Sequence, residues 1–270
     1  MTHGIESILD RLWSDYTHVN PRAQRIHQLL ADRGDRVVND HIALRTLRHP
    51  KLGIDVTARL FEHHGYSAKD EYEFPEKKLH ARHYEHENPA LPTVFISELK
   101  LEELSRGLRD IVDSMMRQVS PAELPEDAFV LGGCLWHRIL KDTYETLRQE
   151  SEYAAWVAAF GFRANHFTVS VNELESFDSL EALNDFLKEQ GFVLNDVGGE
   201  IKGSPPDLLQ QSSTLAEPCE VRFADGMAEI PGCCCEFAYR YPLPSGERFS
   251  GFVAQSAEPI FESTDHRVSS

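Results

Sequence analysis

The sequence predicts an α+β fold in which two β-α-β-β-β modules form one curved, half-closed sheet, with added helices before and between the modules. The first observation is that apolar residues change from helical spacing to strict alternation in 36–47 and again in 162–172. The second is that both stretches are followed by a helical pattern ending at a glycine, Gly65 or Gly191, and then by short extended runs. The order of elements therefore repeats, which predicts two equivalent halves.

The chain of 270 residues is predicted to be a single domain. Residues 1–35 should form a helical cover, 36–99 the first module, 100–160 a helical insert between the modules, and 161–270 the second module with the C-terminal strand. No Ser/Gly-rich or Pro-rich linker separates these segments, so we expect them to share one core.

Each element follows from local spacing. Residues 3–33 carry two apolar stripes, which are typical of two amphipathic helices. In the first module we expect a strand over 36–47, a helix from Gly53 to His64, and extended runs at 72–74, 79–85 and 92–99. In the second we expect a strand over 162–172, a helix from Ser179 to Gln190, and extended runs at 192–196, 219–225 and 233–241.

The charge balance restricts the partners. The formal net charge is −17, whereas a nucleic-acid-binding surface needs a basic footprint and an anionic membrane attracts basic segments. No apolar run approaches the roughly 18 to 20 residues that cross a bilayer. The N-terminus lacks a signal-peptide pattern. We therefore expect a cytoplasmic protein that acts on a small molecule, without nucleic acid or membrane.

Five cysteines are present, and three of them are adjacent, Cys233 to Cys235. The count is odd and no C-x-x-C occurs, so neither a disulfide framework nor a structural zinc site is indicated. We interpret these residues as buried free thiols on a strand.

Strand alternation brings three metal-ligating side chains together. His41 and His166 occupy equivalent places on the first strands of the two modules, and both should face the concave side of the sheet. Glu236 shares its strand face with Ala238 and Arg240, so it should face the same cavity. Two imidazoles and one carboxylate can cover one face of an octahedral ion and leave positions open for ligands. The alternative is that the histidines are hydrogen-bonded core residues without a metal.

This donor set without thiolate suits iron(II), while manganese, nickel, cobalt and zinc are chemically compatible. Arg45 lies four residues after His41 on the same strand face, roughly 13 Å further along. Its guanidinium can bind a carboxylate through two hydrogen bonds. The alternative for Arg45 is a salt bridge to an acidic residue of the protein itself.

A second histidine group, His80, His83 and His86, has a spacing of three residues. On a strand His80 and His83 face opposite sides, so they cannot chelate one ion together. We interpret this group as part of a polar surface.

Five stretches resemble the 2-oxoadipate dioxygenase/decarboxylase family, also called D-2-hydroxyglutarate synthase. That family's fold is similar to the vicinal oxygen chelate proteins. Together the stretches span most of the chain from about residue 36 onward. They are VVNDHIALRT, RANHFTVSVN, EIKGSPPDLLQQSSTLAE, IPGCCCEFAYRYP and FSGFVAQSAEPIFEST.

The resemblance implies that the three predicted metal ligands match the family's iron(II) ligands and that Arg45 matches its substrate-carboxylate arginine. Ser256 resembles a substrate-contacting serine, whereas Lys202 and Gln211 fall in a family-like stretch without an assigned role. The implied reaction consumes O2 and a 2-oxo dicarboxylic acid such as 2-oxoadipate, and yields CO2 and a 2-hydroxy acid that is one carbon shorter.

Two other function classes compete with this hypothesis. One is an oxygen-independent lyase, isomerase or hydrolase of the same fold that uses a metal such as zinc or nickel. The other is a module that binds a small ligand and has structural histidines. Oxygen uptake separates the first class from a dioxygenase, and metal analysis of untagged protein addresses the second.

Overall fold

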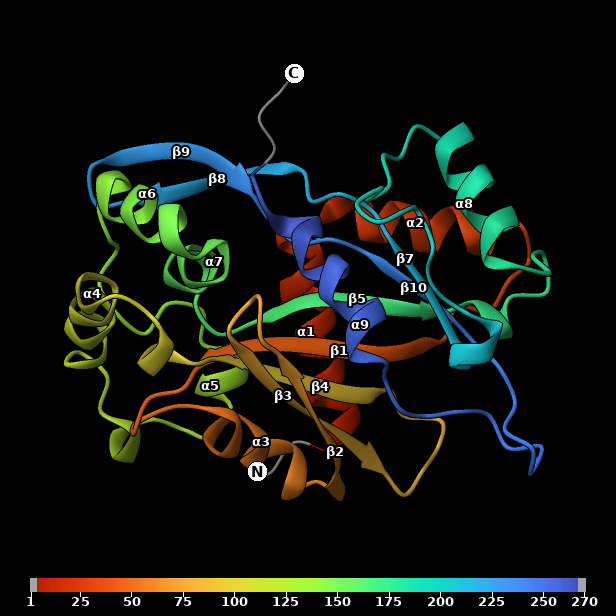
Figure 1. Cartoon of the computed structure of the whole chain (residues 1–270), viewed down its shortest axis with the longest axis horizontal. Helices are drawn as coiled ribbons and strands as arrows, with labels where there is room; N and C mark the ends of the chain where they lie inside the picture. The colour runs from red at the N-terminus through yellow and green to blue at the C-terminus, as the bar shows by residue number, and fades with distance from the viewer. Residues whose placement is uncertain (1–3, 267–270) are drawn as a thin grey trace.

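The two predicted halves form one curled, eight-stranded sheet in the computed structural model, which describes residues 4–266 (Figure 1). The outermost residues of the predicted helical cover and second module, 1–3 and 267–270, lie outside the described residues. The strand order is β2-β3-β4-β1-β5-β10-β7-β6. The strands are β1 (Asn39–Leu47), β2 (Tyr66–Phe74), β3 (Leu79–His86), β4 (Thr93–Leu99), β5 (Ala164–Ser170), β6 (Lys202–Ser204), β7 (Leu209–Ser213) and β10 (Glu236–Arg240).

Strand pairing reproduces the sequence repeat. In the first module β1 pairs in parallel with β4, and in the second β5 pairs in parallel with β10. The two modules join where β1 and β5 run antiparallel, with Ile42 opposite Phe167. His41 lies opposite Thr168 and His166 opposite Ala43, so the two histidines are equivalent about that central pair. The predicted equivalence of the two first strands is confirmed.

The helices also follow the predicted order. The cover consists of α1 (Ile5–Val19) and α2 (Pro21–Asp32), and the modules contain α3 (Ile54–Glu62) and α8 (Leu180–Glu189). The insert contains α4 (Arg106–Met116), α5 (Ala128–Leu131), α6 (Lys141–Glu150) and α7 (Glu152–Phe160). The short helices α9 (Ala254–Ala257) and η5 (Glu258–Thr264, a 3-10 helix) follow the last strand. Gly65 and Gly191, at φ +92° and +84°, follow α3 and α8 in the left-handed conformation that ends helices.

The strands of the second module differ in detail from the prediction. The expected run at 192–196 forms only an isolated bridge between Leu194 and Thr214. The expected run at 219–225 lies in a separate hairpin, β8 (Pro218–Phe223) with β9 (Gly226–Pro231), beside α6 (Figure 1). The sheet is completed instead by β6 and β7. Local alternation cannot show which strand a segment pairs with, since that depends on distant residues.

Helix α1 packs on the convex side of the sheet, whereas the C-terminal segment and two side chains of α7 lie against the concave side. Tyr16 of α1 packs on Phe167, which points away from the face that carries His166. Helix α9 contacts β2 at one edge of the sheet and β6 and β7 at the other, so it bridges the two ends of the curl. In Figure 1 it lies in front of β1 and β5.

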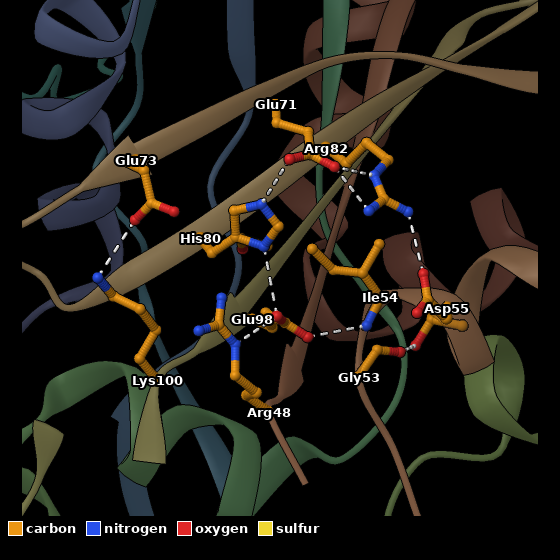
Figure 2. A network of polar contacts seen from close by, with 12 residues as sticks. Arg48, Gly53, Ile54, Asp55, Glu71, Glu73, His80, Arg82, Glu98 and Lys100 are labelled. Carbon is orange, nitrogen blue, oxygen red and sulfur yellow. Dashed lines mark hydrogen bonds and ion pairs between the residues drawn. The ribbon is translucent and has the colours of Figure 1, made fainter. Parts of the chain in front are cut away.

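A polar network fixes α3 to the convex side of the first module (Figure 2). Glu98 of β4 accepts hydrogen bonds from Arg48 at 2.7 Å and from the backbone N–H of Ile54, the first residue of α3, at 3.0 Å. His80 lies 3.3 Å from the same carboxylate. A side chain at Gly53 would place its Cβ 2.9 Å from Glu98. Glycine is therefore needed where the carboxylate caps the helix.

The five cysteines are free, and Cys233 to Cys235 are buried. They precede β10 instead of lying on it, because the strand begins at Glu236. Among residues 4–266, no helix combines the length and apolar character needed for a membrane span.

Candidate metal centre

Two β-bulges shape the centre of the sheet, one on each side of the pseudo-twofold axis. Asn39 pairs with Val169 and His41 with Thr168, so Asp40 is an extra residue on β1. Ala43 pairs with His166 and Leu44 with Ala164, so Asn165 is an extra residue on β5. A bulge redirects the side chain of its extra residue. Asp40 and Asn165 consequently lie beside the histidines that follow them.

The bulged residues orient the two imidazole rings. Asp40 Oδ1 lies 2.8 Å from Nδ1 of His41, and Asn165 Oδ1 lies 3.2 Å from Nδ1 of His166. Asp40 thus lies on the same side of the sheet as His41, although regular alternation would place two adjacent side chains on opposite faces. In many metal sites an acceptor that binds Nδ1 of a histidine leaves the other ring nitrogen, Nε2, as the ligand atom.

Both Nε2 atoms face the carboxylate of Glu236, the first residue of β10. The distance is 3.6 Å from His41 to Oε1 and 2.8 Å from His166 to Oε2. One ligand atom from each residue lies within 4.8 Å of the other two. The side chains of Glu236 and His41 are 1% and 3% exposed, whereas that of His166 is 12% exposed. The structure thus brings together the three predicted ligands, and the open side of the cluster is at His166.

The electrostatics suit a cation. Burial alone would raise the pKa of Glu236, but His166 and His41 outweigh it and lower the pKa to about 2. Burial would lower the pKa of each imidazole, yet the nearby carboxylate raises both. The raised imidazole pKa values and the lowered carboxyl pKa show that the surroundings of these three side chains favour a positive charge. A divalent ion coordinated by two imidazoles and a carboxylate replaces those protons with the same sign of charge.

Arg240 extends the cluster from the far end of β10. Its guanidinium makes two hydrogen bonds with Asp40, at 2.7 and 2.9 Å, and donates to the carbonyls of Phe249 and Gly251. The next residue, Phe252, packs edge-on against the His41 ring with 4.8 Å between centroids. Arg240 therefore fixes Asp40 behind His41 and also holds the loop that covers it.

Arg45 is buried, with 4% of its surface exposed. Its guanidinium stacks over Tyr153 and Trp156 at 4.9 and 5.1 Å and donates one hydrogen bond to Thr264 at 3.0 Å. Within residues 4–266 it forms no salt bridge, so the alternative interpretation of Arg45 is not supported. Burial lowers its pKa. A buried guanidinium with one neutral hydrogen-bond partner retains donors for an anion.

A cavity of about 30 Å³ connects Arg45 with the three candidate ligands. Its roof comes from the C-terminal segment, through Phe252, Ala257, Ile260 and Phe261. The C-terminal segment therefore covers the candidate ligands with mostly apolar side chains.

The other predicted residues have different surroundings. Gln211 lines the cavity and donates from Nε2 to Glu236, whereas its Oε1 is buried without a partner. Lys202 donates to the carbonyls of Asn195 and Glu200, away from the cavity lining. Ser256 is buried on α9, with its hydroxyl 3.2 Å from the position of a Cβ at Gly203. It is not among the residues that line the cavity.

His80 and His83 lie on opposite sides of the sheet, as predicted, but they do not both belong to a polar surface. His80 joins the network of Glu98, whereas His83 is 1% exposed and lies on the concave side. Its Nδ1 is 2.8 Å from the hydroxyl of Tyr72, and its ring packs near Phe252. The interpretation as surface is wrong for His83.

Three polar residues of the centre escaped the sequence reasoning: Asp40 and Asn165 as described above, and Thr168, whose hydroxyl lies 3.0 Å from Nε2 of His41. Alternation places Arg240 on the face of Glu236, but it does not predict the pairing of Arg240 with Asp40. One usable signal existed, because both repeats place an Asp or Asn directly before the histidine. Bulges invalidate alternation at that position, and neither bulge is visible in the sequence.

Three solved structures resemble this chain over most of its length. A proposed hydrolase from Shewanella frigidimarina is 48% identical, with a TM-score of 0.88 over 94% of this chain and 99% of that chain. The hydroxyglutarate synthase of Oryza sativa, solved with 2-oxoadipate, is 34% identical, with a TM-score of 0.89 over 97% and 92%.

The third is a proposed glyoxalase-superfamily protein from Ralstonia eutropha. It is 22% identical, with a TM-score of 0.76 over 90% of this chain and 83% of that chain. This likeness concerns the fold alone, and it agrees with the predicted vicinal oxygen chelate-like arrangement.

The family model described as 2-oxoadipate dioxygenase/decarboxylase matches residues 7–249. The match includes the first module, the helical insert, the second module as far as residue 249 and the three candidate metal ligands. The chain therefore belongs to the 2-oxoadipate dioxygenase/decarboxylase family.

Proposed function

We propose that this protein is a non-haem iron(II)-dependent dioxygenase/decarboxylase. It converts a 2-oxo dicarboxylic acid such as 2-oxoadipate, with O2, into CO2 and a 2-hydroxy acid one carbon shorter, such as 2-hydroxyglutarate. The observation that carries the proposal is the pairing of a His41–His166–Glu236 cluster with the buried cation Arg45 in one cavity. The bound 2-oxoadipate of the rice relative supports the substrate class.

His41, His166 and Glu236 would hold the ion. Bound iron(II) supplies a Lewis acid for the 2-oxo acid and the electrons that activate O2. Asp40 and Asn165 keep both Nδ1 atoms engaged, so that both Nε2 atoms remain directed at the same point. This arrangement leaves part of the coordination sphere for substrate and oxygen.

Charge balance supports a dianionic substrate. Asp40 and Arg240 neutralise each other, and Glu236 cancels one of the two charges of a divalent ion. Arg45 adds another positive charge in the same cavity. Asp265 acts on Arg45 electrostatically but forms its ion pair with Lys77. One charge of the ion and the charge of Arg45 then remain without an ion pair, and a dicarboxylate supplies two negative charges. A buried charge is costly unless it is paired, so this balance favours a dicarboxylate over a monocarboxylate.

The protein's own residues would position and shield the substrate. Arg45 binds the carboxylate at the end remote from the metal ligands and thereby fixes the orientation of C1 and C2. Phe95, Phe252 and Phe261 line the cavity with apolar rings. With the C-terminal segment closed, these rings exclude bulk water from the reacting carbons.

The proposed reaction balances without an external reductant. The bond between C1 and C2 breaks, and the C1 carboxylate leaves as CO2. One oxygen atom of O2 enters the new carboxylate at the former C2, and the other becomes the hydroxyl on the former C3. The oxidative decarboxylation and the hydroxylation together supply the four electrons that O2 accepts.

An oxygen-electrode screen of 2-oxo acids with four to seven carbons, using iron(II)-reconstituted protein, tests the proposal. We expect the fastest O2 uptake with a dicarboxylic acid and one CO2 released per O2 consumed. With 18O2, mass spectrometry should find two labelled oxygens in the hydroxy acid. Turnover under argon at the aerobic rate would instead establish the oxygen-independent lyase or hydrolase class.

A further inference from the structure

The two bulged residues occupy equivalent positions but differ in chemistry. Asp40 uses one oxygen for His41, and Arg240 binds its carboxylate through two hydrogen bonds. Asn165 uses Oδ1 for His166, and its Nδ2 is buried without a hydrogen-bond partner. Only Asn165 also lines the cavity. All the hydrogen-bonding groups behind His41 therefore have partners in this respect, whereas the Asn165 amide behind His166 has one unpartnered donor.

The chemistry of His166 fixes which way the Asn165 amide points. Nε2 of His166 faces Glu236 at 2.8 Å, so the ring proton of a metal-bound His166 resides on Nδ1. That N–H donates to Oδ1 of Asn165, and a flipped amide would place two donors against each other. The unpartnered atom is thus the amide donor, which requires an acceptor oxygen. Since Asn165 is 2% exposed, bulk water does not supply one.

The position of Asn165 indicates which end of a ligand it meets. It contacts Nδ1, the ring nitrogen directed away from Glu236, so its amide lies behind His166 as seen from the metal ligands. On β1 the neighbouring positions are Ala43 and Leu44, and Arg45 follows them. Asn165 and Arg45 therefore line the same cavity at the end remote from Glu236.

We propose that Asn165 Nδ2 and the Arg45 guanidinium together bind the remote carboxylate of a 2-oxo dicarboxylic acid, so that Asn165 determines the preference for dicarboxylic substrates. This inference rests on the proposed function. A neutral amide is required at this position, because an aspartate like Asp40 would repel the carboxylate. The chemical difference between the two bulges then has a reason. Asp40 only positions the metal ligand His41, whereas Asn165 positions the metal ligand His166 and also binds substrate.

The test compares 2-oxoadipate with 2-oxohexanoate, which has the same chain length but lacks the second carboxylate. Dissociation constants are measured by calorimetry under argon on the iron(II)-loaded full chain, so that no turnover is involved. Asn165→Asp retains an oxygen for His166 but replaces the donor with a negative charge. We expect it to lower the preference for 2-oxoadipate at least tenfold and to change 2-oxohexanoate binding less than twofold.

The matched control is Asp40→Asn, which makes the reverse exchange at the equivalent bulge. It should keep the preference for 2-oxoadipate over 2-oxohexanoate within about twofold of wild type. Asn165→Ser, which retains a short acceptor for His166 but loses the amide donor, should act in the same direction as Asn165→Asp and covers the case in which the aspartate variant does not fold. All variants are compared at equal iron content.

An unchanged preference, or equal weakening of both acids, overturns the inference, because Asn165 then acts only through His166. If the wild-type chain binds neither acid, the proposed substrate class fails, and the inference fails with it. Wild-type binding of 2-oxoadipate therefore separates the two failures.

Discussion

Two histidine–carboxylate clusters lie on opposite faces of the same sheet. In the outer network, on the convex face, Glu98 contacts His80, Arg48 and the N-terminus of α3 (Figure 2). In the inner centre, on the concave face, Glu236 forms its ion pairs within the described residues with the imidazoles of His41 and His166. Both clusters contain histidine and glutamate, yet their charge balance differs.

The difference shows what a metal site requires beyond suitable residue types. Arg48 and the helix N-terminus already compensate Glu98, so a bound cation would have to displace a guanidinium and a backbone N–H. Glu236 has no permanent cationic partner among the described residues, because Gln211 donates to it from a neutral amide and the imidazoles release their protons when a metal binds. The inner centre also contains buried polar atoms without partners, at Asn165 and Gln211. A bound metal and substrate would satisfy these groups, whereas the protein itself satisfies the outer network.

The largest expected effect comes from Glu236→Gln. The substitution keeps the size of the side chain but removes the one anionic ligand, so we expect iron content and O2 uptake to fall to background. Metal analysis of untagged protein and an oxygen electrode measure the two quantities. Full iron content in this variant would mean that the ion binds elsewhere.

Arg45→Met should have the next largest effect. Methionine preserves much of the packing against Tyr153 and Trp156 but leaves the substrate carboxylate unpaired. Removing one partner of a buried charge pair costs ~2–5 kcal/mol, which corresponds to a fall in kcat/KM for 2-oxoadipate of roughly 30-fold to several thousand-fold. Steady-state kinetics measure it. Iron content should be unchanged, and an equal loss with 2-oxohexanoate would contradict the assigned role.

Asp40→Asn tests the support of the inner centre. The amide can still accept from His41, but it loses the charge that pairs with Arg240. Changes to a residue that orients a metal-binding histidine cost about 10- to 100-fold in metal affinity. Competition with a chromophoric chelator measures the iron affinity. Unaltered affinity would show that Asp40 serves only the packing of the 249–252 loop.

Glu98→Gln is the corresponding change in the outer network. It weakens the hydrogen bonds that join β4 to Arg48 and α3, so we expect a loss of about 1–2 kcal/mol in the free energy of unfolding. Urea denaturation of the metal-free protein measures the loss. Because the outer network does not contact the cavity, iron content and kcat/KM should remain within about twofold of wild type. A large fall in either would remove the functional distinction between the two faces.

The smallest expected effect is a pH dependence of the metal-free protein. The pKa values of His41 and His166 are raised in the folded chain, so their contribution to stability is complete below the ordinary imidazole pKa and is lost as pH rises through the raised values. The pKa of Glu236 is lowered to about 2, so its contribution is present above its ordinary pKa of 4.5 and is lost as pH falls towards 2.

Thermal unfolding between pH 5 and 9 measures the first of these contributions. The melting temperature of the metal-free chain should fall on the alkaline side relative to a His41→Gln, His166→Gln variant. Iron(II) should stabilise the wild type increasingly as pH rises, because it competes with those protons. Parallel pH profiles for the two proteins would contradict this coupling.

Much of the inner centre could be predicted because its ligands lie on strands that alternate. His41 and Arg45 share a face at a spacing of four, and Glu236 and Arg240 share another in the same way. The helices and their glycine ends followed from local spacing as well. Local rules failed at 219–225, where a well-alternating strand pairs outside the main sheet with β9.

The sequence by itself determined the repeat, the three candidate ligands and the presence of an arginine on their face, because side-chain direction on a regular strand depends only on position. The tertiary structure alone decided the two bulges, and with them the roles of Asp40 and Asn165, since a bulge exists only relative to the strand paired with it. It also decided that Arg45 forms no salt bridge within the described residues and that the C-terminal segment covers the cavity. Both depend on residues more than 200 positions apart, which local physical rules do not connect.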